Sequence, residues 1–241
     1  MTDTKFERNK LSLIKRYTTL IERNPEKPLY YYNRGVAYGS LGKREEEIKD
    51  YTKAIELDPK DAKVYHNRGV VYGAQGKFEK AIRDLTKAIE LNPSFATMAY
   101  YNRGVAYGVL EKFEEAITNY TKAIELSPKY GWAYYNRGVA YEVQGKPEEA
   151  IKDYTKVIEL SPNNAMAYYN RGVAYGVLGK SEEAIKDYTR AIELNPEEAN
   201  YYYNRGKVYY QLHLNEQAML DYKRAVELSP VYADSSFAYD E

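Results

Sequence analysis

The side chains that most often carry out catalysis are scarce in this chain and do not recur together. There are two histidines, His66 and His213, and no cysteine. The lack of cysteine excludes thiolate chemistry, disulfides and cysteine-ligated metals. No serine has a recurring histidine partner, and the phosphate-binding pattern GxxxxGK[ST] is absent. We therefore predict that the protein is not an enzyme and has no catalytic residue, no metal site and no cofactor.

A different kind of chemistry, ion pairing, recurs at a fixed spacing. An arginine returns along the chain at Arg34, Arg68, Arg103, Arg137, Arg171 and Arg205. Sixteen residues after each stands an acid, with Asn119 as the exception: Asp50, Asp84, Asp153, Asp187 and Asp221. Because a partly buried arginine needs a partner, we predict that each arginine hydrogen-bonds such an acid in a structural role. Arginine heads lying free in a groove would instead indicate an anionic ligand.

These arginines belong to a repeat that runs through the chain. The tripeptide Asn-Arg-Gly recurs at intervals of 34, 35, 34, 34 and 34 residues, and a proline after each Glu-Leu-x block keeps the same intervals. Two markers that keep one period indicate internal structural repeats. We expect the one additional residue to lie in the connection of residues 94–99, because loops tolerate insertions better than helices do.

Each repeat has the pattern of two helices. Tyr31, Gly35 and Tyr38 recur at i, i+4 and i+7, as one stripe of an α-helix does, and Gly42 then interrupts the pattern. The next segment has apolar residues on one side and charged residues on the other, and it ends before Pro59. Neither helix is apolar enough to bury a face alone, whereas stacked repeats share a continuous core. The sequence therefore predicts an all-α solenoid.

The repeat resembles the tetratricopeptide repeat (TPR), whose signature is W-x2-L-G-x2-Y, then A-x3-F, then P. The first copy matches it as Tyr31-x2-Arg34-Gly35-x2-Tyr38, then Glu47-x3-Tyr51, then Pro59. Later copies carry the small residue of the signature, as in Ala150-x3-Tyr154. The resemblance covers residues 28–230 and implies a right-handed superhelix of helix–turn–helix repeats. We expect six of them, at about 28–61, 62–95, 96–130, 131–164, 165–198 and 199–232.

The two ends are expected to be partial repeats. Residues 17–25 align with residues 51–59, so residues 1–27 are predicted to form a half-repeat, a capping helix without its first partner. Residues 231–241 begin where another first helix would start, but they lack the Asn-Arg-Gly block. We predict a partial cap there, a short helix followed by a disordered tail.

The resemblance also implies a function. In this family the first helices line a concave face that holds an extended peptide. The matching positions give the predicted peptide-binding residues Asn33, Asn67, Asn102, Asn136, Asn170, Asn204, Tyr32, His66, Tyr101, Tyr135, Tyr169, Tyr203, Val105, Val139 and Val173. An asparagine can both donate to and accept from a peptide unit, so this ladder would hold a peptide backbone. The alternative is that the asparagines only brace adjacent helices.

Two features modify that expectation. Chaperone-binding members of the family clamp a terminal carboxylate with Lys and Arg on this face, and those cations are mostly absent here, which favours an extended, uncharged or aromatic segment. A second set of mid-helix glycines either opens space for a ligand or reflects looser packing: Gly39, Gly73, Gly108 and Gly176. The residues that break the pattern on this face are the best indicators of specificity: Glu142, Lys207, Tyr210 and His66.

Composition narrows the partner. Lys+Arg and Asp+Glu both number 35, so the net charge is zero, which disfavours nucleic acid and anionic membranes. An RNA-reading repeat would also need reading residues that differ between copies. No apolar run resembles a signal peptide or a membrane span. We predict a cytoplasmic protein that binds a protein or extended peptide, no nucleic acid and no membrane. Head-to-tail contacts between the incomplete ends, giving a weak homo-oligomer or a self-assembling solenoid, are the alternative.

Overall fold

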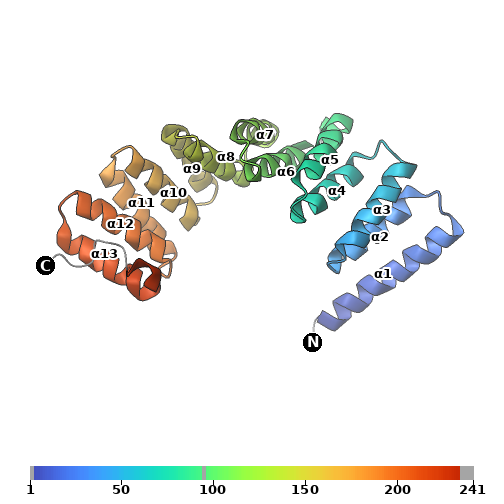
Figure 1. Cartoon of the computed structure of the whole chain (residues 1–241), viewed down its shortest axis with the longest axis horizontal. Helices are drawn as coiled ribbons and strands as arrows, with labels where there is room; N and C mark the ends of the chain where they lie inside the picture. Colours follow the sequence, from blue (N-terminus) through green and yellow to red (C-terminus); the bar gives the residue numbers. More distant parts are fainter. Residues whose placement is uncertain (1–2, 94–95, 234–241) are drawn as a thin grey trace. The chain divides into compact units, whose positions relative to one another are not determined.

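The computed structural model describes residues 3–93 and 96–233, and every regular element in those ranges is helical (Figure 1). A short 3-10 helix, η2 (Pro230–Tyr232), follows the last α-helix. The α-helices are α1 (Asp3–Arg23), α2 (Pro28–Ser40), α3 (Arg44–Leu57), α4 (Ala62–Ala74), α5 (Phe78–Leu91), α6 (Ala96–Val109), α7 (Phe113–Leu126), α8 (Gly131–Val143), α9 (Pro147–Leu160), α10 (Ala165–Val177), α11 (Ser181–Leu194), α12 (Ala199–Gln211) and α13 (Asn215–Leu228). The predicted all-α class is confirmed.

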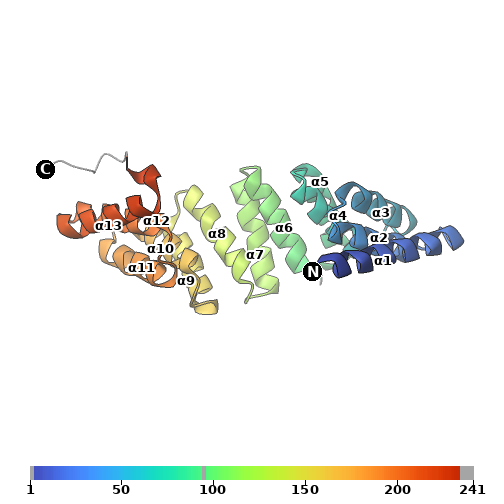
Figure 2. The same ribbon diagram turned by 90° about the horizontal axis from the view of Figure 1, so that it is seen from below.

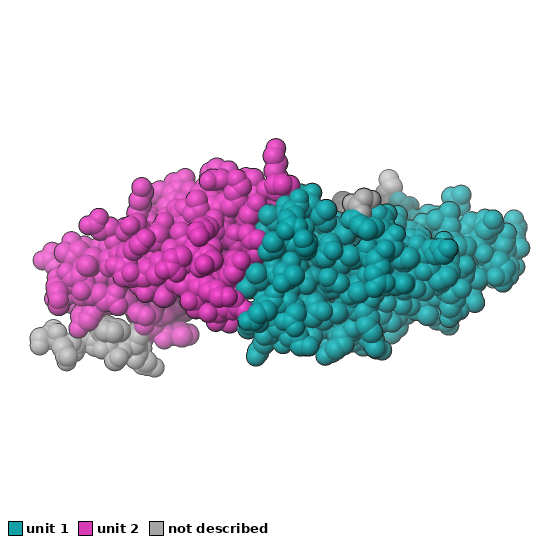
Figure 3. Space-filling model, turned by 90° about the horizontal axis from the view of Figure 1, so that it is seen from above, with its two compact units in different colours: residues 1–127 teal, residues 128–241 magenta. Residues whose placement is uncertain are grey.

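The helices pack as consecutive pairs in two compact units, residues 1–127 and 128–241 (Figure 3). In the first unit α2 packs on α3, α4 on α5 and α6 on α7; in the second, α8 packs on α9, α10 on α11 and α12 on α13. Within a unit each second helix also contacts the next first helix, as α5 contacts α6 and α11 contacts α12 (Figure 2). We call the even-numbered members of these pairs first helices. First helices also contact one another, as α4 contacts α6 and α10 contacts α12.

The turn inside each repeat explains where the first helix ends. It places one residue in the left-handed region, at φ 72° for Gly42 and φ 68° for Gly145. Glycine adopts this conformation without a steric penalty. Two repeats place other residues there, Glu111 and His213, both at φ 58°. His213 is therefore an exposed residue of this turn.

The additional residue of the third repeat falls within residues 94–99, as expected, but it lengthens the start of a helix, so the expectation that it lies in a connection is wrong. Helix α6 has 14 residues and begins at Ala96, whereas α4 has 13 residues. Ala96 and Ala99 are both buried, so the lengthened first turn packs against its neighbours. One more residue at the start of a helix interrupts no backbone hydrogen bond, because the first N–H groups have no partner within the helix. Ser94 and Phe95 lie outside the described residues.

The ends of the chain extend the stack. Helix α1 packs on α2, and the Thr18 hydroxyl accepts a hydrogen bond from Arg34 Nη1 at 3.1 Å. Thr52 of α3 contacts Arg68 in the same way, at 3.0 Å. At the other end, the ring of Tyr232 in η2 lies 4.6 Å from that of Tyr203. Residues 234–241, where a disordered tail was predicted, lie outside the described residues.

Candidate functional site

A tyrosine of the second helix joins the two helices of a repeat. In the fifth repeat a Cβ added to Gly172 would lie 2.8 Å from Cε1 of Tyr188, so only glycine allows this approach. The Tyr188 side chain is buried, and the centroid of its ring lies 5.9 Å from that of Tyr169 on the first helix. The same glycine–tyrosine contact recurs in the other repeats except the second, where Leu85 replaces the tyrosine.

The recurring spacing of arginine and aspartate produces a bidentate ion pair. Arg171 donates through Nε and Nη2 to the two carboxylate oxygens of Asp187, at 2.7 and 2.8 Å. Its guanidinium also lies over the rings of Tyr168 and Tyr175, at 5.7 and 5.9 Å. Burial alone would lower the pKa of Arg171, but the hydrogen bonds and charge of Asp187 outweigh burial and raise it. The same pair forms at Arg34, Arg68, Arg137 and Arg205.

The exception among the arginines follows from the sequence. Arg103 Nε donates to the amide oxygen of Asn119 at 2.8 Å, and Nη1 donates to Thr86 at 2.9 Å. Because Asn119 carries no charge, burial dominates and lowers the pKa of Arg103. The predicted structural role of the arginines is therefore confirmed, with an amide in place of the acid in one repeat.

The asparagines of the predicted ladder bond to the preceding repeat. The side-chain amides of Asn67, Asn170 and Asn204 donate to the hydroxyls of Tyr32, Tyr135 and Tyr169, at 3.2, 3.0 and 3.0 Å. Asn102 contacts Nε2 of His66, which stands in place of tyrosine, at 3.3 Å. These bonds link successive first helices, so the asparagines brace the stack whatever else they do.

The remaining predicted residues lie on the same helices and are largely half-exposed. His66 is the buried one, at 6% exposure, and burial lowers its pKa. The half-exposed set comprises Asn33, Asn136, Tyr101, Tyr203, Val105, Val139 and Val173, together with the tyrosines and asparagines named above. They belong to α2, α4 and α6 in the first unit and to α8, α10 and α12 in the second, and we call the exposed surface of these helices within either unit the first-helix face.

One pocket in each unit lies between two consecutive first helices. The pocket between α4 and α6 has a volume of about 330 Å³ and is lined mostly by apolar side chains, among them Val70, Phe78 and Leu85. The pocket between α10 and α12 has a volume of about 220 Å³ and adds the polar groups Asn204, Lys207 and Gln211. Of the predicted residues, Asn102 and Val105 line the first, and Val173 and Asn204 line the second.

The second set of glycines explains where these pockets open. Gly73 lines the first pocket and Gly176 the second. An added Cβ at either would meet its nearest neighbour only at 3.9 Å, so the space beside each is open. Beside Gly39 the Glu47 carboxylate occupies the equivalent space, 2.3 Å from an added Cβ. In the fourth repeat the glycine itself is replaced, by Glu142.

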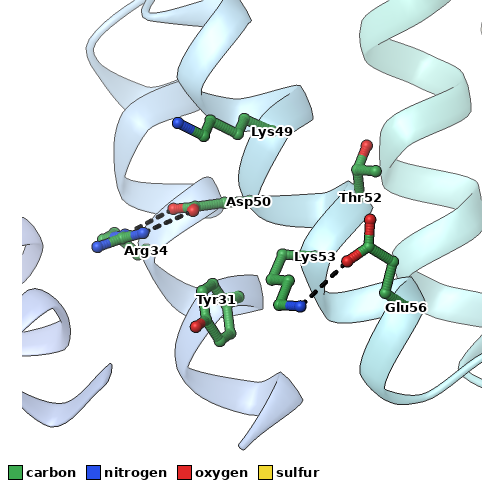
Figure 4. Close-up of a pocket in the computed structure, with 7 residues that line it drawn as sticks. All are labelled: Tyr31, Arg34, Lys49, Asp50, Thr52, Lys53 and Glu56. Carbon is green, nitrogen blue, oxygen red and sulfur yellow. Dashed lines mark hydrogen bonds and ion pairs between the residues drawn. The ribbon is translucent and has the colours of Figure 1, made fainter. Parts of the chain in front are cut away.

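A third pocket, about 390 Å³ in volume, lies over α2 and α3, and four of its five charged lining groups pair with one another (Figure 4). Figure 4 shows Arg34 paired with Asp50 and Lys53 paired with Glu56. The pocket is therefore formed around the structural ion pair. Among residues 3–93 and 96–233, no three His, Asp or Glu side chains are arranged to hold a metal ion.

Comparisons with known proteins agree with the repeat geometry. Models of the tetratricopeptide repeat match residues 62–95, 131–164, 165–198 and 199–232, and a TPR repeat model matches residues 40–76 and 110–145. Together these matches cover more than half of the chain. The chain belongs to the tetratricopeptide repeat family. No protein with a curated description matches the sequence.

Several solved TPR structures are similar to this chain. A crystal structure of MamA protein is 30% identical, with a TM-score of 0.68, over 73% of this chain and 96% of that chain. YrrB, described as a TPR protein with an unusual peptide-binding site, is 29% identical, with a TM-score of 0.68, over 75% and 92%. The C-terminal part of a TPR protein from Cytophaga hutchinsonii is 21% identical, with a TM-score of 0.78, over 97% of both chains. That last likeness supports the fold alone.

Sequence reasoning missed one set of TPR contacts that the period contains. A threonine of the preceding second helix accepts a hydrogen bond from five of the six arginines, Arg34, Arg68, Arg103, Arg171 and Arg205: Thr18, Thr52, Thr86, Thr155 and Thr189. These threonines recur at the repeat interval, which is the signal that would have found them.

None of the helices in the described part of the chain has the length and apolar character needed to span a membrane.

Proposed function

We propose that this TPR protein is a protein-interaction scaffold that holds an extended segment of a partner protein on its first-helix face, without catalysis. The observation that carries the proposal is the pair of pockets at Gly73 and Gly176. They occupy the same position of the repeat in two separate units, and each lies between consecutive first helices. The family and the peptide-binding site named for YrrB support the same function.

The two pockets suit side chains of an extended chain. Successive side chains of a strand point to opposite sides, so every second one faces the surface on which it lies. The pocket at Gly73 is apolar because Leu85 replaces the tyrosine found in the other repeats, and it suits an aliphatic or aromatic side chain. The pocket at Gly176 offers Lys207 and Gln211 and suits a side chain with a polar end.

The asparagines restrict how a peptide backbone would be held. Asn204 Nδ2 donates at 3.0 Å to the hydroxyl of Tyr169 and at 2.9 Å to the carbonyl of Asn200, which uses both amide hydrogens. Its side-chain oxygen is then the group that would accept from a ligand N–H. We infer that this asparagine braces the stack and presents an acceptor, so the two interpretations of the ladder are compatible.

A peptide-display selection tests the proposal. Immobilised full-length protein is exposed to a random library of extended decapeptides, and the enriched peptides are measured against Gly73→Leu/Gly176→Leu. Leucine favours the helix over glycine and fills both pockets, so the variant should stay folded by circular dichroism. We expect peptides to be enriched by the wild type and to lose most of their affinity for this variant.

The matched control places a leucine in the pocket over α2 and α3. Lys53→Leu adds the same side chain where the lining groups pair with one another. Peptide binding should be unchanged by Lys53→Leu. A selection that enriches no peptide, or peptides that respond to Lys53→Leu and not to the glycine variant, would contradict the proposed function.

A further inference from the structure

The fourth repeat differs from its neighbours on the first-helix face. Glu142 stands where four of the other five repeats have glycine. It lies on α8 in one stripe with Trp132 and Tyr135, since these residues are spaced by 3 and 7 positions. Trp132 is the only tryptophan of the chain and is 63% exposed. Its ring meets that of Tyr135 edge-on at 6.4 Å.

The Glu142 carboxylate interacts with tyrosines of four helices, through one hydrogen bond and through its charge. The hydroxyl of Tyr154 on α9 donates to it. Burial is the largest cause of the raised pKa of Tyr188 on α11 and of Tyr169 on α10, the latter to about 12. The negative charge of Glu142 is a smaller cause that also raises both pKa values. Burial raises the pKa of Tyr135 most, and the hydrogen bond from Asn170 lowers it. The charge of Glu142 raises it further. Burial raises the pKa of Glu142 itself, although the hydrogen bond from Tyr154 acts to lower it.

The first repeat shows how the chain neutralises a carboxylate in this position. Glu47 reaches the equivalent space beside Gly39, accepts from the Tyr51 hydroxyl at 3.2 Å, and pairs with Arg44 at 2.8 Å. Glu142 has the corresponding tyrosine bond, but among residues 3–93 and 96–233 no Lys or Arg nitrogen lies within 4.0 Å of it. Lys146, one turn further on, donates to Gln144 at 2.8 Å. Glu142 is therefore a half-buried carboxylate without a cation.

We propose that Glu142 and the tyrosines with which it interacts form a subsite for a basic side chain, Lys or Arg, of the bound segment. This rests on the proposed function and names the chemistry of the partner. A cation at this place would supply the charge that Arg44 supplies to Glu47, and aromatic faces favour cations further. A divalent metal fits less well, because it takes several oxygen ligands and the fourth repeat offers one carboxylate. The sequence favoured an extended, uncharged or aromatic segment. The proposed subsite changes that prediction to a segment with one basic residue.

The experiment sequences the peptides enriched in the selection described above, for the wild type and for Glu142→Gln. Glutamine keeps the shape and the acceptor for Tyr154 while removing the charge. Glu159→Gln is the control, because it makes the same change in the same repeat at an exposed glutamate paired with Lys156. We expect a Lys or Arg at one fixed position for the wild type and for Glu159→Gln, and no such preference for Glu142→Gln.

Affinity of one enriched peptide completes the test. Replacing its basic residue by methionine should weaken binding to the wild type about tenfold, because the charge-assisted hydrogen bond to Glu142 is lost. The same replacement should have little effect with Glu142→Gln. Enriched peptides with the same basic preference for both proteins, or with none, overturn the subsite and leave the peptide-binding function standing. No enriched peptide at all overturns both.

Discussion

Arg171 and Asp187 share two hydrogen bonds, at 2.7 and 2.8 Å, while Arg171 Nη1 donates to Thr155 of the preceding repeat at 3.0 Å. One guanidinium therefore connects three helices, α9, α10 and α11. In the TPR signature this position is a leucine, which packs but has no fixed direction of bonding. The planar guanidinium instead fixes the angle between one repeat and the next.

Removing one member of this pair should be strongly destabilising. In Arg171→Ala the Asp187 carboxylate, whose side chain is 5% exposed, is left without a cation. We expect a loss of about 3–5 kcal/mol in the free energy of unfolding, measured by urea denaturation. The double variant Arg171→Leu/Asp187→Leu should recover most of that loss, because replacing a whole buried pair by apolar groups is often neutral. Equal losses in the single and double variants would contradict this account.

The third repeat allows the opposite experiment. Asn119→Asp would give Arg103 the carboxylate that the other repeats have. A charge-assisted pair is stronger than the present neutral bond, so we expect a gain of about 1 kcal/mol at neutral pH. The bond from Asn119 Nδ2 to the carbonyl of Glu115, at 2.7 Å, would be lost and reduces the gain. Asn92→Asp, at the exposed C-terminal end of α5, is the control, and an equal effect there would argue against a specific pair.

Much of the fold could be predicted because the same residue pattern recurs in every repeat. The interval between Arg34 and Asp50 returns in five repeats, so one buried pair explains five aspartates at once. The place of the additional residue could not be predicted in this way. A 34-residue period does not say whether one more residue extends a helix or a loop, and the structure places it in the helix, because α6 has 14 residues where α4 has 13.

The site was less predictable, because it depends on side chains that differ between repeats. The glycines at Gly39 and Gly73 are identical in sequence, but the space beside Gly39 is filled by Glu47, eight residues later on the next helix. The bracing role of Asn170 likewise needed the position of Tyr135 in the preceding repeat. A sequence shows which residue types recur, whereas a pocket reflects where one side chain fails to reach.

Two glycines of α10 should respond oppositely to the same substitution. Gly172→Ala places a methyl group 2.8 Å from Tyr188 and should destabilise the protein by about 1–3 kcal/mol, as overpacking does. Gly176→Ala meets its nearest atom at 3.9 Å and should stabilise the protein by up to about 1 kcal/mol, since alanine favours the helix. Both are measured as changes in the urea midpoint. Loss of stability in both variants would show that the second glycine is also needed for packing.

The turn of the third repeat can be improved. Glu111 adopts φ 58°, where the equivalent residues of four repeats are glycines. A left-handed conformation costs an ordinary residue roughly 1–2 kcal/mol. Glu111→Gly should therefore stabilise the protein by about 1 kcal/mol, after the greater flexibility of glycine in the unfolded chain is deducted. Gly42→Glu is the converse change and should destabilise by a similar amount; the same sign for both would contradict the assignment.

His66 should make the stability of the protein depend on pH. It is buried, with Asn67 and Asn102 at its two ring nitrogens, and burial lowers its pKa below the ordinary value of 6.5. Above that value both the folded and the unfolded chain hold the neutral ring, and its contribution is fully present. As the pH falls below 6.5, the unfolded chain takes up the proton first, so the folded state loses stability until its own lowered pKa is passed. His66→Tyr, the residue of the other repeats, should remove this loss between pH 7.5 and pH 5.5 in thermal melting, about two units that span the ordinary histidine pKa. The control is His213→Asn, which changes the only other histidine; if that variant removes the loss instead, the assignment to His66 is wrong.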